Sequence, residues 1–105
     1  MDFIRLDKVS AREDGGVVMC VVSVNPLDNS IKTQEYLMDK IELCLDYIKT
    51  EEFVRKYPDA KIENTWIVLE LVEEPTNLMK ELFRRIAEWT EFHHARFSWI
   101  VNENL

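Results

Sequence analysis

The sequence predicts an α+β domain, a two-layer sandwich in which a four-stranded, mainly antiparallel sheet packs against two helices in the order β-β-α-β-α-β. Three observations support this fold class: short runs rich in β-branched residues, two longer stretches with the period of a helix, and turn-forming clusters between them. The chain has 105 residues without an internal repeat or a linker, so we expect a single domain over residues 1–105.

The first two strands are expected to form a hairpin. Residues 3–9 alternate weakly between apolar and polar side chains, and residues 17–24 are dense in valine. Residues 12–16, which lie between these runs, end in two glycines that can supply the positive φ of a tight turn. Residues 25–30 begin with Asn-Pro and are typical of a loop.

The spacing predicts a first helix from about Thr33 to Lys49. Its apolar residues fall within roughly 100° of arc; they are Leu37, Ile41, Cys44, Leu45 and Ile48. The pattern continues irregularly through residues 53–57, which fits either an extension of the helix or a separate turn. Pro58 ends it, because proline cannot donate a helical hydrogen bond.

The second half predicts a strand, a helix and a strand. Residues 62–72 and 95–101 are rich in apolar, β-branched and aromatic side chains. Thr76 is a suitable N-cap for a helix that runs to about His93. The apolar stripe of this helix is roughly 140° wide; it consists of Leu78, Met79, Leu82, Phe83, Ile86, Trp89 and His93.

Three of the four expected strands are apolar on both sides over much of their length, whereas a sheet with one face in water usually alternates apolar and polar residues. Either the helices lie on both faces of the sheet, or the second face is covered by a partner or by a second copy of the chain. The sequence leaves these alternatives and the strand order open.

The chain is acidic, with 20 acids against 13 bases and a formal net charge of −7. Phosphates would be repelled by such a surface, so we expect no nucleic acid partner. No apolar run approaches the roughly 20 residues of a membrane span, so we expect no membrane partner either. The charge fits a basic protein partner, and it also fits simple solubility. Cys20 and Cys44 look like small buried apolar groups, and residues 1–5 lack the pattern of a secretory signal, so we expect a cytoplasmic protein.

No residue pattern predicts catalysis, a cofactor or a metal. His93 and His94 are adjacent on a helix and point about 100° apart, so they do not converge on one ion; His93 is expected to satisfy a carbonyl group in the last turn. The serines and cysteines lack a nucleophile motif, and the glycine pair lies in a hairpin turn and not between a strand and a helix. We therefore expect a protein that is not an enzyme.

The clearest polar pattern is an acidic ridge on the first helix, formed by Glu35, Asp39, Glu42 and Asp46. These residues span roughly 60° and point about 140° away from the apolar stripe. Such a ridge is either a solvated helix face or a preassembled surface that steers a basic partner into place. Trp66, on the side of its strand opposite Ile67, Leu69 and Leu71, is the best candidate for an exposed aromatic anchor.

Residues 37–48, which read LMDKIELCLDYI, and the later Tyr-Pro-Asp-Ala at residues 57–60 resemble a family of small uncharacterised bacterial proteins. In that family a similar Leu-x-x-Lys-Ile…Tyr-Ile run precedes Tyr-Pro and a strand. The size, acidity and element order are also similar to immunity proteins of bacterial toxin systems, including contact-dependent growth inhibition.

The second resemblance implies an immunity protein that binds a cognate basic toxin domain, often a nuclease, and blocks its active site. It assigns no binding residue, so the acidic ridge and Trp66 remain the candidates from the residues themselves. The alternative is a homodimeric structural or adaptor domain, similar to a secretion chaperone, that buries the second sheet face on itself.

Overall fold

The N-terminal hairpin consists of β1 (Ile4–Ala11) and β2 (Val17–Ser23) in the computed structural model, which describes residues 4–103. Gly15 has a φ of +87° and its amide donates to the carbonyl oxygen of Arg12 at 3.1 Å, which confirms the expected glycine turn. The pairing shifts between Leu6 and Lys8, where β1 carries a bulge. The expected first position of this strand, Phe3, lies outside the described residues.

The first predicted helix is α1 (Ile31–Ile48), which begins after Ser30, whose hydroxyl accepts from the amide of Thr33 at 3.1 Å. The expected apolar stripe faces the core: Leu37, Ile41, Cys44 and Leu45 are buried. The irregular segment that follows is a separate helix, α2 (Glu51–Lys56), because the Thr50 hydroxyl caps a new N-terminus. The order is therefore β-β-α-α-β-α-β, with three helices instead of the expected two.

The second half follows the expected order with shorter strands. A 3₁₀ turn, η1 (Ile62–Asn64), precedes β3 (Thr65–Leu71), and β4 (Arg96–Val101) closes the sheet. Between these strands lies α3 (Asn77–Phe92), whose N-cap is the predicted residue Thr76; its hydroxyl accepts from the amide of Met79. The N-cap residue therefore predicted the start of this helix correctly.

The sheet is mixed, so the expectation of a mainly antiparallel sheet was wrong. Its order is β1-β2-β3-β4; the first pair is antiparallel, and both later pairs are parallel. The physical reason is the helical connection between neighbouring strands. A helix carries the chain back to the end of the sheet where the previous strand began, so the next strand runs in the same direction.

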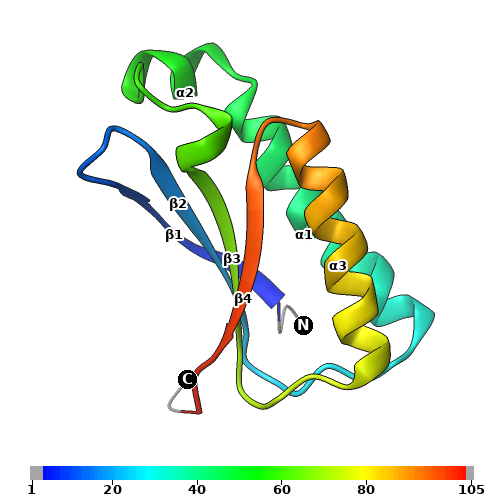
Figure 1. The fold of residues 1–105 in the computed structure, drawn as a ribbon. Coiled ribbons are helices and arrows are strands. Elements are labelled where there is room, and N and C mark those ends of the chain that lie inside the picture. Colours follow the sequence, from blue (N-terminus) through cyan, green and yellow to red (C-terminus); the bar gives the residue numbers. More distant parts are fainter. Residues whose placement is uncertain (1–3, 104–105) are drawn as a thin grey trace.

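Figure 1 shows that α1 and α3 lie on one side of the sheet and leave the other side without a helix. Crossovers between parallel strands are right-handed, and two of them that advance in the same direction place both helices on the same face. The helices are therefore not split between two faces. The hydrophobic core lies between the helices and the sheet, and its largest fully buried side chains include Phe83, Met19, Leu37 and Ile67.

Candidate functional site

The acidic ridge lies on the solvent-exposed side of α1. Glu35, Asp39, Glu42 and Asp46 are all exposed, and no ion pair among residues 4–103 involves any of them. The exposed acids of α3 differ, since Arg84 contacts both Glu81 and Glu88. At 1.5 Å per residue the ridge is about 16 Å long. It therefore presents uncompensated negative charge along three turns of helix.

Two large apolar side chains flank this ridge. Leu43 is 58% exposed and Ile31 is 73% exposed, and on the helical wheel they fall on opposite sides of the four carboxylates. Lys40, whose ammonium lies 5.2 Å from the centre of the Tyr36 ring, is the base nearest the ridge in sequence. An exposed leucine beside unpaired carboxylates combines an apolar anchor with a charged rim, which is the composition of many protein interfaces.

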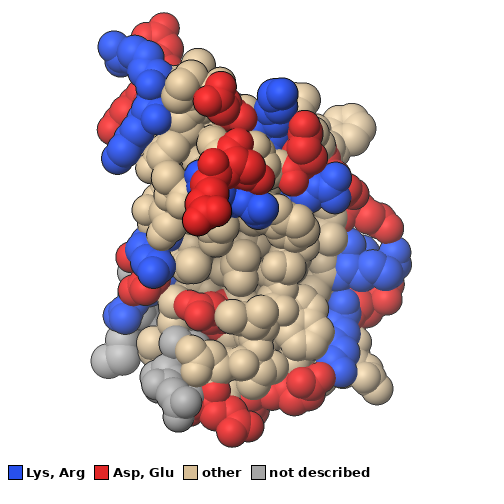
Figure 2. All heavy atoms as spheres, turned by 60° about the vertical axis from the view of Figure 1, so that its left-hand side comes forward, with Lys and Arg blue, Asp and Glu red and all other residues tan. Residues whose placement is uncertain are grey.

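The second candidate surface is the open sheet face, which we define as the face of the sheet opposite α1 and α3. Its β2 to β4 residues alternate with those that face the helices, and all but the buried Val22 are half-buried or exposed; they are Val18, Cys20, Val22, Trp66, Val68, Glu70, Arg96, Ser98 and Ile100. On this side, Figure 2 shows a broad area of uncharged atoms with Lys, Arg, Asp and Glu mostly around its margin. An apolar sheet face of this kind is unusual for a surface in contact with water only.

Trp66 lies on the open sheet face, half-buried, next to Arg96 of the neighbouring strand. The guanidinium carbon of Arg96 is 5.8 Å from the centre of the indole ring, and Arg96 Nη1 is 3.8 Å from a carboxylate oxygen of Glu91. The Nε of Arg96 is buried without a hydrogen-bond partner among the described residues. A buried donor of this kind is costly unless an acceptor approaches it.

The structure does not bring the predicted partner-binding residues together. The four carboxylates project from α1 away from the sheet, whereas Trp66 projects from the opposite side of the sheet. The ridge and the open sheet face are two separate surfaces.

The two histidines and two cysteines, which all lie within the described residues, do not form a metal site. His93 Nδ1 lies 3.3 Å from the ammonium of Lys49, and this contact replaces the expected one with a carbonyl group of the last helical turn. Among residues 4–103 no group of three or more His, Cys, Asp or Glu is arranged to hold a metal ion. Cys44 is buried as expected, and burial raises the pKa of its thiol to about 12. Cys20 is only half-buried, because it belongs to the open sheet face.

Sequence reasoning missed a cavity of about 320 Å³ at the end of the molecule where β3 and β4 begin. Its walls come from the ends of α1 and α3, from α2 and from the segment before β3. These residues are spread between positions 48 and 94, so no local motif signals the cavity. Its basic residues come from three separate segments: Lys49 and His93 are the C-caps of α1 and α3, and Lys61 precedes η1.

The fold and these surfaces define a small α+β protein with a mixed sheet, one face of which is covered by α1 and α3 (Figure 1). The chain belongs to a family of unknown function, DUF6572, whose model matches residues 2–103. No curated protein and no solved structure matches the chain. Within the described part of the chain, no helix combines the length and apolar character needed to cross a membrane.

Proposed function

We propose that this protein acts by binding and not by catalysis, and that it is an immunity protein that neutralises a basic bacterial toxin. The observation that carries the proposal is the acidic ridge: four exposed carboxylates on one helix face, without an ion pair among the described residues. A toxin that cleaves nucleic acid needs cationic residues to hold phosphates, and a rigid row of carboxylates can occupy the same cations.

Leu43 supports this proposal because charge alone provides steering more than affinity. Its side chain is 58% exposed and lies between Asp39 and Asp46 along the helix. If the partner covers Leu43, the contact excludes water around the neighbouring ion pairs and strengthens them. We therefore place the centre of the interface at Leu43, with the carboxylates as its rim.

The experiment places a photo-crosslinking amino acid at Leu43 or, as a matched control, at Ile100 on the open sheet face; both side chains are exposed. Crosslinking is carried out in the native host and the captured protein is identified by mass spectrometry. We expect the probe at position 43 to capture a basic protein whose toxic activity is lost on addition of one equivalent of this chain. Capture at position 100 but not at position 43 contradicts the proposal.

A second candidate function is that of a homodimeric domain closed by the open sheet face, and the specific support for it is charge complementarity. Arg96 and Trp66 lie at one end of this face, and Glu70 and Ile100 lie at the other end. If two copies stack with their strands in opposite directions, Arg96 of one copy approaches Glu70 of the other. Each contact also offers a carboxylate to the guanidinium of Arg96, whose side chain is 41% exposed.

Val68 lies in the middle row of this face, beside Cys20, so both report on dimerisation. For a dimer we expect the alkylation of Cys20 to slow as the protein concentration rises, and Val68→Asp to abolish this protection. The control is Leu78→Asp, which adds the same charge at a 51% exposed position on α3. A Cys20 reaction rate that does not depend on concentration, together with a monomer in sedimentation, rules this candidate out.

A further inference from the structure

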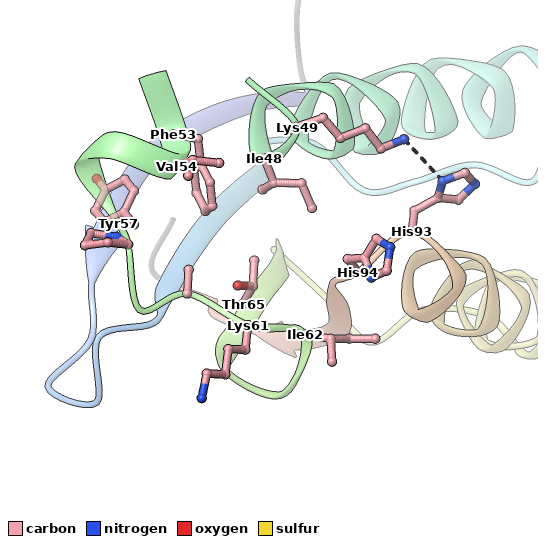
Figure 3. A pocket seen from close by; sticks show the side chains of 12 residues that line it. Ile48, Lys49, Phe53, Val54, Tyr57, Lys61, Ile62, Thr65, His93 and His94 are labelled. Atoms are coloured by element: carbon pink, nitrogen blue, oxygen red, sulfur yellow. Dashed lines mark hydrogen bonds between the residues drawn. The ribbon is translucent and has the colours of Figure 1, made fainter. Parts of the chain in front are cut away.

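The cavity at the amino ends of β3 and β4 has an apolar interior. Ile48, Phe53, Val54 and Ile62 are among its lining residues, and the cavity measures about 320 Å³, within the range of small-molecule sites. Figure 3 shows these side chains around a shared space that is closed on one side by α2 and on another by the end of α3. At the opposite end of the parallel strands, the hollow beside Pro75 measures only about 30 Å³, which is near the size of one water molecule.

One edge of the cavity is cationic. Lys49 and His93 are the C-caps of α1 and α3, and His94 follows directly. The residues that line the cavity include no Asp or Glu, although the chain carries seven more acids than bases. Figure 3 shows Lys49 reaching toward His93, whereas the amino group of Lys61 points away from the other lining side chains.

The contact between Lys49 and His93 joins two basic groups without a carboxylate. The ammonium donates to Nδ1 of the imidazole over 3.3 Å, which requires that this nitrogen carries no proton. Cations at helix C-termini are commonly explained by the helix dipole, but that effect does not require the two bases to touch each other. A carboxylate at this edge can accept from the ammonium with one oxygen and from a protonated imidazole with the other.

We propose that this cavity binds a small apolar molecule that carries one carboxylate, with the apolar body against Phe53 and Ile62 and the carboxylate at Lys49 and His93. The inference is independent of the acidic ridge and of the open sheet face. His94 stands at the same edge in a left-handed conformation with a φ of 70°, where a helix end normally has glycine. Non-glycine residues held in a left-handed conformation cluster at functional sites, and this one places an imidazole at the edge of the cavity.

The test uses 2-naphthoate as a probe and 2-naphthamide, its uncharged isostere, as the matched ligand. Binding is followed by ¹H–¹⁵N NMR on the full chain. We expect naphthoate to shift the amide signals of Ile62, Thr65 and His94, and naphthamide to bind about tenfold more weakly, since it loses a charged hydrogen bond. Equal binding of the two ligands, or shifts confined to the open sheet face, overturns the proposal.

The protein-side test is Lys49→Met, which keeps the length of an exposed side chain and removes its charge. We expect naphthoate affinity to fall about tenfold while naphthamide affinity stays the same. The control is Lys32→Met at the opposite end of α1, which changes the net charge equally and should leave both affinities unchanged. Equal loss in the two variants shows a general charge effect and overturns the proposal. His93→Gln provides a second variant with the same expected selectivity.

Discussion

Arg96 and Trp66 form a cation–π pair across neighbouring strands, with the guanidinium carbon 5.8 Å from the centre of the indole ring. The pair occupies one end of the open sheet face, where the buried Nε of Arg96 has no hydrogen-bond partner among the described residues. The ring therefore adds to the stabilisation of a guanidinium whose Nη1 lies 3.8 Å from a carboxylate oxygen of Glu91.

A double-mutant cycle measures this relationship. For Trp66→Ala and Arg96→Ala we expect a coupling energy of about 0.5–1 kcal/mol in the free energy of unfolding from urea titrations. Trp66→Ala combined with Arg85→Ala is the control, because Arg85 is on α3, on the other side of the sheet, so the two effects should add. A coupling energy near zero for the first pair shows that the ring and the guanidinium do not interact.

Gly16 is required by a close approach and not by its backbone angle. A Cβ atom at this position would overlap the carbonyl oxygen of Asn64 and lie 2.6 Å from the Asn64 Cβ. Asn64 is itself fixed, because its side-chain oxygen accepts from the amide of Lys61 at 2.6 Å. We expect Gly16→Ala to lower the free energy of unfolding by about 1–3 kcal/mol. Ser10→Ala on β1 provides a nearby control, and thermal unfolding that is equal for both variants contradicts this packing.

His94 ends α3 in a left-handed conformation. The amide of Ala95 donates to the carbonyl oxygen of Thr90 at 3.0 Å, and that of His94 donates to Glu91 at 3.2 Å, the pair of hydrogen bonds that usually surrounds a glycine. His94→Gly should raise the free energy of unfolding by about 0.5–1 kcal/mol, because glycine removes the steric cost of the Cβ. His94→Ala keeps the Cβ and should give no gain. Equal effects of the two substitutions in urea titrations show that the Cβ does not strain the cap.

Burial raises the pKa of the Cys44 thiol from 9.0 to about 12. The folded state therefore holds this proton more tightly than the unfolded state, so its contribution to stability is complete below pH 9 and is lost as the pH rises toward 12. In that window we expect the free energy of unfolding of the wild type to fall more steeply than that of Cys44→Ala, by up to about 1.4 kcal/mol per pH unit. Parallel pH profiles in urea titrations contradict the assignment.

Burial raises the pKa of both thiols, and only the thiolate is reactive, so the difference in exposure between Cys20 and Cys44 predicts a difference in their alkylation. At pH 8 iodoacetamide should alkylate Cys20, which is half-buried on the open sheet face, and should leave Cys44 unmodified until urea unfolds the chain. Mass spectrometry of peptides reads out each site. Modification of Cys44 in the folded protein shows that the core around α1 opens more readily than its burial implies.

Helices and strands were predictable where a short stretch of sequence determines them. The valine-rich run of β2 is typical of a strand and Thr76 is typical of a helix N-cap, so both elements were located correctly. The apolar residues on both sides of β2 and β3 also indicated that the second face of the sheet is apolar. In the structure this face is the open sheet face, which neither α1 nor α3 covers (Figure 1). The strand directions were mispredicted, because they follow from how two helical crossovers pack on the sheet and not from any single segment.

The candidate site was predictable only in part. The acidic ridge lies within one helix, so its exposure follows from helical spacing, and the structure places all four carboxylates in solvent. The ridge and Trp66 lie on opposite sides of the molecule because α1 covers one face of the sheet and Trp66 belongs to the other face (Figure 1). The spacing of residues along one helix or strand does not reveal which face of the sheet a helix covers. The cavity beside Lys49 and His93 joins residues that are 44 positions apart, and only the fold brings them together.

The most direct test of the proposed binding function uses the partner that crosslinking identifies, purified separately. Its rate of association with this protein is measured as a function of ionic strength. The triple variant Asp39→Lys, Glu42→Lys and Asp46→Lys should associate much more slowly at low salt and keep its thermal unfolding midpoint, because the ridge contributes steering and little stability. A second triple variant reverses three exposed acids outside the ridge and matches the change in net charge; it consists of Glu13→Lys, Glu63→Lys and Glu73→Lys. Its association should change far less. If the two triple variants associate at the same rate, the acidic ridge is not the docking surface.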